Sequence, residues 1–134
     1  MRLIFALFAL AASPAAAQDY YGFQSPTGNI HCGIFAGEFA WARCDLVETT
    51  VMSFPTPPAE CDLDWGHAFE VEATGAGKPA CSGDTIADPA NEVLGYGQSV
   101  SVAGFTCTSA TTGMTCTNAD GHGFTVRKGG QKVF

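Results

Sequence analysis

Three histidines and a few acidic residues near them are the side chains in this sequence best suited to bind a metal ion. The set consists of His31, His67 and His122 with Asp62, Asp64 and Asp120. Imidazole nitrogens and carboxylate oxygens are common zinc ligands. However, no two histidines stand four residues apart, and no His-Glu-x-x-His sequence occurs. We therefore expect no metal and no cofactor, and a zinc site assembled from separate loops is the alternative.

The stretch Asp62-Leu63-Asp64 resembles the start of a calcium-binding loop. Such a loop needs a glycine at its sixth position and a bidentate glutamate at its twelfth. His67 and Ala73 occupy these two offsets. The stretch is therefore expected to be an ordinary acidic loop rather than a calcium site.

Four carboxylates that lie close in sequence are candidates for the acid and base of a hydrolase: Glu60, Asp62, Glu70 and Glu72. Glu70 and Glu72 alternate with apolar residues, so both should point outward from one strand, where a general acid lacks the burial that raises its pKa. No Gly-x-Ser-x-Gly sequence occurs. The even number of cysteines leaves no unpaired thiol nucleophile. A non-catalytic protein is favoured, and an exported hydrolase or metal-dependent enzyme is the alternative.

Six cysteines indicate a disulfide framework, because an even number in an exported chain is typical of crosslinked domains. No Cys-x-x-Cys pair is present, which argues against zinc. Cys107 and Cys116 flank a turn-rich stretch containing Gly113, and a hairpin there would place the two sulfur atoms opposite each other. We therefore favour pairing between neighbours in the sequence, which gives Cys32–Cys44, Cys61–Cys81 and Cys107–Cys116.

The first seventeen residues have the three parts of a cleavable signal peptide. Arg2 supplies a positive charge, residues 3–12 form an apolar run, and Ala15-Ala16-Ala17 provides small residues at a cleavage point between Ala17 and Gln18. The apolar run is shorter than the ~20 residues that span a bilayer. The sequence therefore predicts a periplasmic or secreted protein with no membrane span after signal removal, and a retained short anchor is the alternative.

Residues 18–134 are expected to form a single β-rich domain with six cysteines. Without Arg2, five basic residues stand against thirteen acidic ones, a net charge of −8. This charge disfavours binding to nucleic acid and to anionic membranes. A cationic exported protein is the kind of partner that it favours.

Alternation of apolar and polar residues is the dominant pattern, and it predicts an all-β sandwich or barrel-like domain held by disulfides. The segments with this alternation are 30–34, 69–73, 99–102, 105–107, 114–116, 124–127 and 132–134. The best helix candidate, residues 88–94, has at most two turns. Residues 53–60 and 75–79 are expected to be loops because they contain prolines or glycines. His122 lies between two glycines, which marks a tight turn with a close backbone approach.

Aromatic residues provide the material for a binding face: Tyr20, Tyr21, Trp41, Trp65 and Tyr96. Tyrosine and tryptophan supply large, rigid contact areas at interfaces. Trp41 and Trp65 each lie near a cysteine, however, and large aromatic side chains dominate the cores of small domains. We therefore expect these two to pack in the core against disulfides.

Several motifs resemble a family of uncharacterised exported bacterial proteins with six cysteines, known only as a domain of unknown function. They are the opening Phe-Gln-Ser-Pro-Thr-Gly-Asn-Ile-His-Cys of residues 23–32, residues 43–45, 64–66, 81–85 and 95–97, the Gly-Met-Thr-Cys-Thr-Asn of residues 113–118, the Gly-His-Gly-Phe of residues 121–124, and residues 133–134. The resemblance implies export, structural cysteines and a compact β-rich domain, and brings no catalytic residues. A non-catalytic binding or interaction module is the expected function, and a purely structural envelope component is a further alternative.

Overall fold

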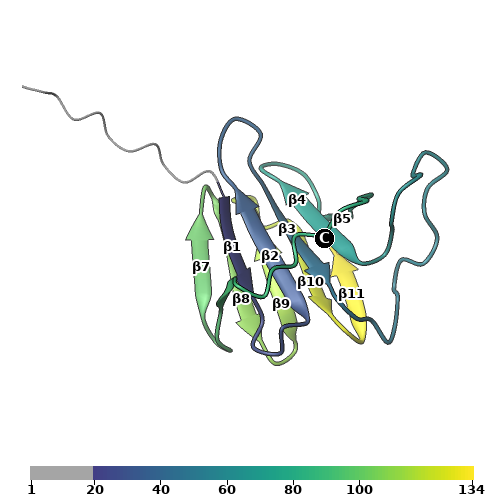
Figure 1. Ribbon diagram of the computed structural model, residues 1–134. Helices are drawn as coiled ribbons and strands as arrows, with labels where there is room; N and C mark the ends of the chain where they lie inside the picture. Colours follow the sequence, from purple (N-terminus) through teal and green to yellow (C-terminus); the bar gives the residue numbers. More distant parts are fainter. Residues whose placement is uncertain (1–19) are drawn as a thin grey trace, which may run out of the picture.

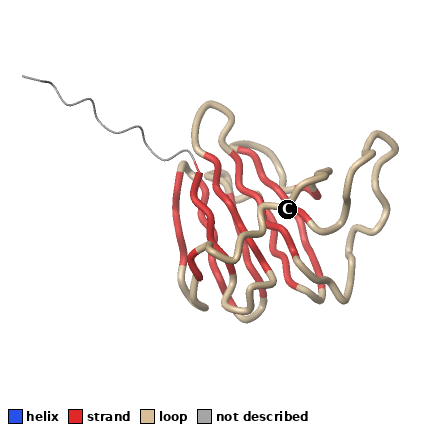
Figure 2. The backbone as a smooth tube through the Cα atoms, in the orientation of Figure 1, coloured by secondary structure: helices blue, strands red, loops and turns tan. Residues whose placement is uncertain are grey.

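The computed structural model describes residues 20–134, which form two β-sheets packed face to face (Figures 1 and 2). The six-stranded sheet has the order β5 (Lys78–Pro79), β4 (Ala68–Glu72), β3 (Trp41–Leu46), β2 (Ile30–Phe35), β1 (Tyr20–Gln24), β6 (Glu92–Val93). The five-stranded sheet has the order β11 (Gly130–Val133), β10 (Gly123–Arg127), β9 (Gly113–Thr117), β8 (Phe105–Ala110), β7 (Ser99–Val102). The expected signal peptide and its cleavage point lie outside the described residues.

The predicted all-β class is confirmed, and the architecture is a sandwich rather than a closed barrel. The strand pairs are antiparallel except for β1 with β6, which is parallel. Residues 20–134 contain no helix, and thus none that is long and apolar enough to cross a membrane. The sheets are built mostly of hairpins, as the frequent turn signals of the sequence indicate.

The core lies between the two sheets and follows the predicted alternation. Phe69 and Val71 of β4 point inward, as do Phe124 and Val126 of β10, and all four are fully buried. Phe23 and Ile34 from the first hairpin and Phe105 and Met114 from the five-stranded sheet join the same cluster. Since successive side chains of a strand point to opposite faces, each inward residue has an outward neighbour.

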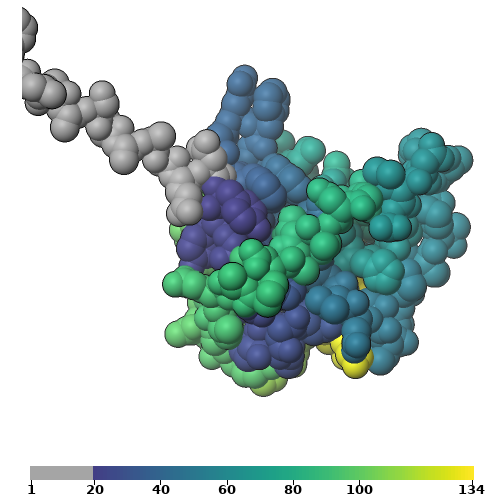
Figure 3. Space-filling view, viewed as in Figure 1, coloured from purple at the N-terminus to yellow at the C-terminus, as the bar shows by residue number. Residues whose placement is uncertain are grey.

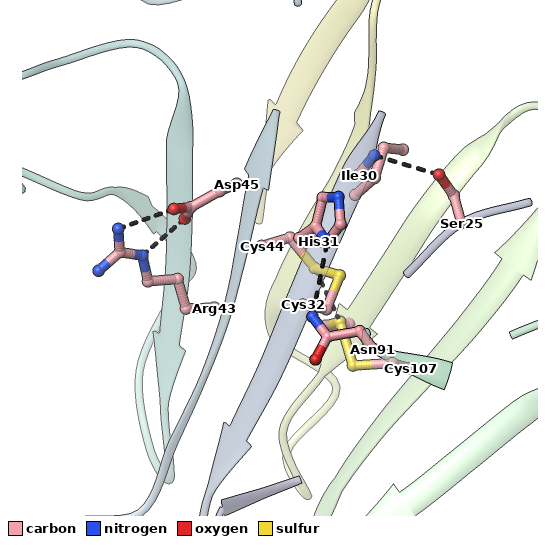
Figure 4. The surroundings of a disulfide bond; sticks show 10 residues. Ser25, Ile30, His31, Cys32, Arg43, Cys44, Asp45, Asn91 and Cys107 are labelled. Carbon is pink, nitrogen blue, oxygen red and sulfur yellow. Dashed lines mark hydrogen bonds and ion pairs between the residues drawn. A yellow bond between two sulfur atoms is a disulfide. The ribbon is translucent and has the colours of Figure 1, made fainter. Parts of the chain in front are cut away.

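The three disulfides join consecutive cysteines of the sequence in pairs, as predicted. Cys32–Cys44 links directly opposed residues of β2 and β3, and Cys107–Cys116 does the same for β8 and β9. These two bridges are fully buried and face each other across the core, with the Cys44 and Cys116 Sγ atoms 3.6 Å apart (Figure 4). Cys61–Cys81 ties two loops together.

One edge of the sandwich is closed by backbone contacts that only glycine allows. The amides of Gly77 and Gly123 both donate to the carbonyl oxygen of Phe134, at 2.9 and 2.8 Å. A Cβ on Gly123 would lie 1.8 Å from the Cys116 carbonyl oxygen, and a Cβ on Gly77 would lie 1.9 Å from the Gly123 carbonyl oxygen. The close backbone approach predicted around His122 is thus confirmed at Gly123, while Gly121 supplies the positive φ of the turn.

The structure corrects four local predictions. The stretch 88–94 is a turn followed by β6 rather than a helix. The reason is that the side-chain amide of Gln24 donates to the Pro89 and Asn91 carbonyl oxygens and holds this stretch extended against β1. Lys78 and Pro79, expected in a loop, form the edge strand β5, and β4 ends before Ala73. The fourth correction concerns the tryptophans and is described with the outer face below.

Candidate functional site

The outer face of the six-stranded sheet divides into a covered half and an open half. Residues 82–91 cross this face on their way from the Cys81 loop to β6, and Figure 3 shows them as a green band over the front of the molecule. Register places outward side chains in three rows across the strands. The row of Gln24, His31 and Asp45 lies beneath the band, and the row of Tyr20, Phe35 and Trp41 lies beyond it.

A buried ion pair anchors the band to the sheet. The Arg43 Nε and Nη2 atoms donate to Asp45 at 2.6 and 2.9 Å, and both side chains are buried (Figure 4). Arg43 Nη2 also donates to the Asp84 carbonyl oxygen at 3.0 Å. The Asp45 Oδ2 atom accepts further bonds from the Thr85 hydroxyl and the Ile86 amide. Burial lowers the pKa of the Arg43 guanidinium, but the bonds and charges of Asp45 and Asp84 outweigh this effect and raise it overall.

His31 is a second anchor for the band. Its Nδ1 atom accepts a hydrogen bond from the Asp88 amide at 3.3 Å, which leaves Nε2 to donate to the Gly28 carbonyl oxygen at 3.0 Å. Asn91 lies beside the same ring (Figure 4). Both ring nitrogens are therefore used in holding the fold, and His31 is 5% exposed.

The other proposed metal ligands are scattered. His67 is exposed just before β4, and His122 is exposed in the turn between β9 and β10, so the three histidines share no site. Asp62 and Asp64 are exposed in the loop that follows Cys61. Within residues 20–134, the one group close enough to hold a metal is Cys32, Cys44 and Cys116, whose sulfur atoms are all in disulfides.

The open half of the outer face carries a row of three aromatic rings. The Phe35 and Trp41 rings are stacked, with centroids 4.3 Å apart and planes inclined by 5°. The Tyr20 ring lies 4.7 Å from Phe35. The Tyr20 ring lies close over Gly22 and Gly33. A Cβ on Gly33 would be only 2.3 Å from the Cε2 atom of Tyr20. The absence of side chains at these two glycines therefore leaves room for the Tyr20 ring close to the sheet.

Trp41 thus lies on the outer face and not in the core between the sheets. It opposes Phe35 on one side and Glu72 on the other, whereas Cys44, three residues on, points inward. Trp65 is half-buried in a loop with its indole nitrogen unpaired within the described residues. Neither tryptophan belongs to the core cluster, so the expectation that both pack in the core is wrong.

A groove begins at Trp41 and is bordered by three carboxylates. We call it the aromatic–acidic groove, defined by Glu38, Phe39, Trp41, Glu70 and Glu72. Its volume is about 460 Å³, and it lies between the β2–β3 turn and the end of β4. The β2–β3 turn projects from the top of the molecule in Figure 1 and carries Phe39, which is 85% exposed. The remaining aromatic candidates, Tyr21 and Tyr96, lie outside this groove.

The groove carries a negative charge that Lys78 offsets only in part. The Lys78 Nζ atom lies 3.8 Å from Glu70 and 3.6 Å from Glu72, while Glu38 forms no ion pair with a described residue. Burial raises the pKa of Glu70, with a further increase from the charge of Glu72, and the charges of Lys78 and Arg43 counteract this only in part. The domain therefore holds a carboxylate whose ionised form lacks full stabilisation, next to an aromatic surface.

This arrangement suits a positive group on a ligand. A cation within about 6 Å of a tryptophan ring is attracted to its face, and nearby carboxylates add charge-assisted hydrogen bonds. The sequence indicates both the aromatic and the acidic part of this groove, since Trp41 is a candidate for a binding face and Glu70 and Glu72 are candidate acids. It gave no sign of Glu38 and Phe39, because residues in a hairpin turn show no periodicity.

One comparison with known proteins gives a match. No curated protein matches the chain, and no solved structure matches it. The model of a family of unknown function (DUF6636) matches residues 2–134. Since this match covers nearly the whole sequence, the chain belongs to that family of unknown function.

Proposed function

We propose that this protein is a non-catalytic binding module, exported to the periplasm or beyond the cell, whose aromatic–acidic groove binds a cationic segment of a partner protein. The observation that carries the proposal is the stacked and partly open Trp41 ring between exposed Phe39 and three carboxylates. Rigid aromatic anchors within a polar rim are typical of protein interfaces.

Export is supported by the three disulfides, because such bridges persist in oxidising compartments and are rare in the cytosol. The signal-like residues 1–17 support the same compartment. The net charge of −8 for residues 18–134 supports a cationic partner, since it attracts positive molecules and speeds their encounter with the domain.

The groove should bind hexalysine, a defined cationic probe, more tightly than the same peptide with every lysine acetylated. Acetylation removes the positive charge and the cation–π contact while keeping the length of the peptide. We expect the acetylated peptide to bind residues 18–134 at least about tenfold more weakly in isothermal titration calorimetry. Trp41→Ala should weaken hexalysine binding to a similar degree, because a central tryptophan is a typical interface hot spot.

Glu60→Gln is the matched control for Glu72→Gln, because each removes one exposed carboxylate but Glu60 lies outside the groove. Glu60→Gln should weaken hexalysine binding only by the general loss of one negative charge, and Glu72→Gln should weaken it further. Equal affinity for the charged and acetylated peptides, or equal effects of Glu60→Gln and Trp41→Ala, would show that the groove is not the site.

Binding of hexalysine should weaken as the pH is lowered from about 7 to about 4. Burial raises the pKa of Glu70 in the free domain, so this carboxyl takes up a proton at a higher pH than an exposed glutamate does. A bound cation favours the carboxylate, and protonation therefore opposes binding. In calorimetric titrations across this range, the affinity for hexalysine should fall less for Glu70→Gln than for the natural domain. Identical pH profiles would contradict the role given to Glu70.

A further inference from the structure

A second cleft, of about 630 Å³, lies at the opposite end of the sandwich from the β2–β3 turn. Its lining comes from the β1–β2, β8–β9 and β10–β11 turns. These turns lie at the bottom of the molecule in Figure 1. We call it the turn-end cleft, defined by Thr27, Tyr96, Ser109, Met114, Arg127 and Lys128. Ile30 and Val47 add apolar surface to its walls. It shares no lining residue with the aromatic–acidic groove.

Ser109 is a polar residue of this cleft that lacks a partner. It points inward from β8 in the same alternation as Phe105 and Cys107, and it is 1% exposed. Its hydroxyl is buried and forms no hydrogen bond within residues 20–134. A buried hydroxyl without a partner is costly, and such groups in native structures call for an explanation. A polar atom of a ligand held in the cleft would supply the missing partner.

The charges of the cleft favour an anion with a single charge. Lys128 and Glu48, both in its lining, form an ion pair with 3.4 Å between Nζ and Oε2. Arg127 forms no ion pair with any described residue. One positive charge is thus left over in the cleft of a protein that is otherwise acidic. A planar guanidinium matches the geometry of a carboxylate, which it can bind through two hydrogen bonds.

Two motifs singled out in the sequence also meet at this cleft. Residues 25–29 form the β1–β2 turn, in which the Ser25 hydroxyl accepts a hydrogen bond from the Ile30 amide. Gly113 and Met114 begin β9 on the opposite wall. The proposed groove uses neither motif, so the cleft gives these segments a common place in the fold.

We infer that the turn-end cleft binds a small molecule that carries one carboxylate and an apolar body. Arg127 binds the carboxylate, and the apolar body lies against Val47 and Tyr96, the exposed apolar side chains of the lining. A carbonyl or amide group of the ligand reaches the Ser109 hydroxyl at the floor. This site is separate from the proposed function, because its ligand has the opposite charge and its residues lie at the other end of the sandwich.

The probe for the test is N-benzoylglycine, which combines a carboxylate, an amide and an aromatic ring, and N-benzoylglycinamide is its uncharged analogue. Titration of residues 18–134 monitored by amide chemical shifts should show N-benzoylglycine moving the signals of Ser109, Gly113 and Gly129. The uncharged analogue should bind about tenfold more weakly, in keeping with loss of a charge-assisted bond. Arg127→Gln should weaken N-benzoylglycine by a similar factor, whereas Lys132→Gln, which removes the same charge outside the cleft, should not.

Ser109→Ala keeps the test independent of folding. Removing an unpaired buried hydroxyl should leave the melting temperature unchanged or slightly higher. The same variant should bind N-benzoylglycine several-fold more weakly. Equal affinity for acid and amide, signals that move elsewhere on the domain, or the absence of any movement up to the solubility of the probe would each overturn the proposal.

Discussion

Replacing Arg43 with methionine should lower the free energy of unfolding by about 3–5 kcal/mol, because it leaves the buried Asp45 carboxylate without its counter-charge. Two of the hydrogen bonds to Asp45 come from Arg43, at 2.6 and 2.9 Å. The Thr85 hydroxyl and Ile86 amide remain as donors but carry no full charge. The band of residues 82–91 also loses its link through Asp84. Urea unfolding followed by tryptophan fluorescence measures the loss.

Two variants separate the buried charge from other effects. Adding Asp45→Asn to Arg43→Met removes the unpaired charge, so the double variant should be more stable than Arg43→Met alone. Lys128→Met breaks an ion pair whose side chains are 52% and 71% exposed, and should change stability by less than about 1 kcal/mol. A loss of similar size for Arg43→Met and Lys128→Met would contradict the argument.

Removing the Cys32–Cys44 bridge by a double substitution to alanine should lower the free energy of unfolding by about 2–5 kcal/mol. The bridge closes a sequence separation of 12 residues, against 20 for Cys61–Cys81. Chain entropy alone predicts about 3 kcal/mol for either bridge, with slightly more for the longer loop. The Cys32–Cys44 bridge also fills space in the core, and the cavity left by its sulfur atoms adds to the loss of stability.

Cys61→Ala combined with Cys81→Ala is the matched comparison, since it removes the same atoms from half-buried and exposed positions. Guanidinium unfolding of the two double variants should show the larger loss for Cys32 and Cys44. If removing Cys61–Cys81 lowers the free energy of unfolding as much as removing Cys32–Cys44 does, loop closure rather than packing dominates. The role given to the buried sulfur atoms is then wrong.

Sequence patterns predicted the fold class because most strands bury one face only. In β10, Phe124 and Val126 alternate with Thr125 and Arg127, and this half-buried pattern is easy to recognise. Four strands were missed: β1, β3, β5 and β6. The strands β5 and β6 are two residues long, which is too short to show an alternation. In β3, the outward face begins with Trp41, so the alternation of residues 42–46 is preceded by a large apolar residue on the polar face. In β1, Tyr20 and Tyr21 are both half-buried, so neither face is marked as polar.

The candidate site was predictable in its residue types but not in its assembly. Trp41 and Glu72 stand far apart in the sequence, and only the pairing of β3 with β4 places them side by side. The expected position of Trp41 in the core failed because a strand sends neighbouring side chains to opposite faces. Sequence proximity to Cys44 therefore says little about contact with its sulfur, since a shift of one residue exchanges the faces.

The lateral edges of the six-stranded sheet limit how this protein can meet other chains. Each edge is a strand of two residues, and one of them contains Pro79, which has no amide hydrogen to donate. Neither edge offers a long row of free peptide groups, so strand addition, the usual route to edge-to-edge aggregation, has no template there. The edge strand β11 of the other sheet is bordered by Ser53, whose amide and hydroxyl both bond to Gln131. Recognition along these three edges must therefore proceed through side chains rather than by extension of a sheet.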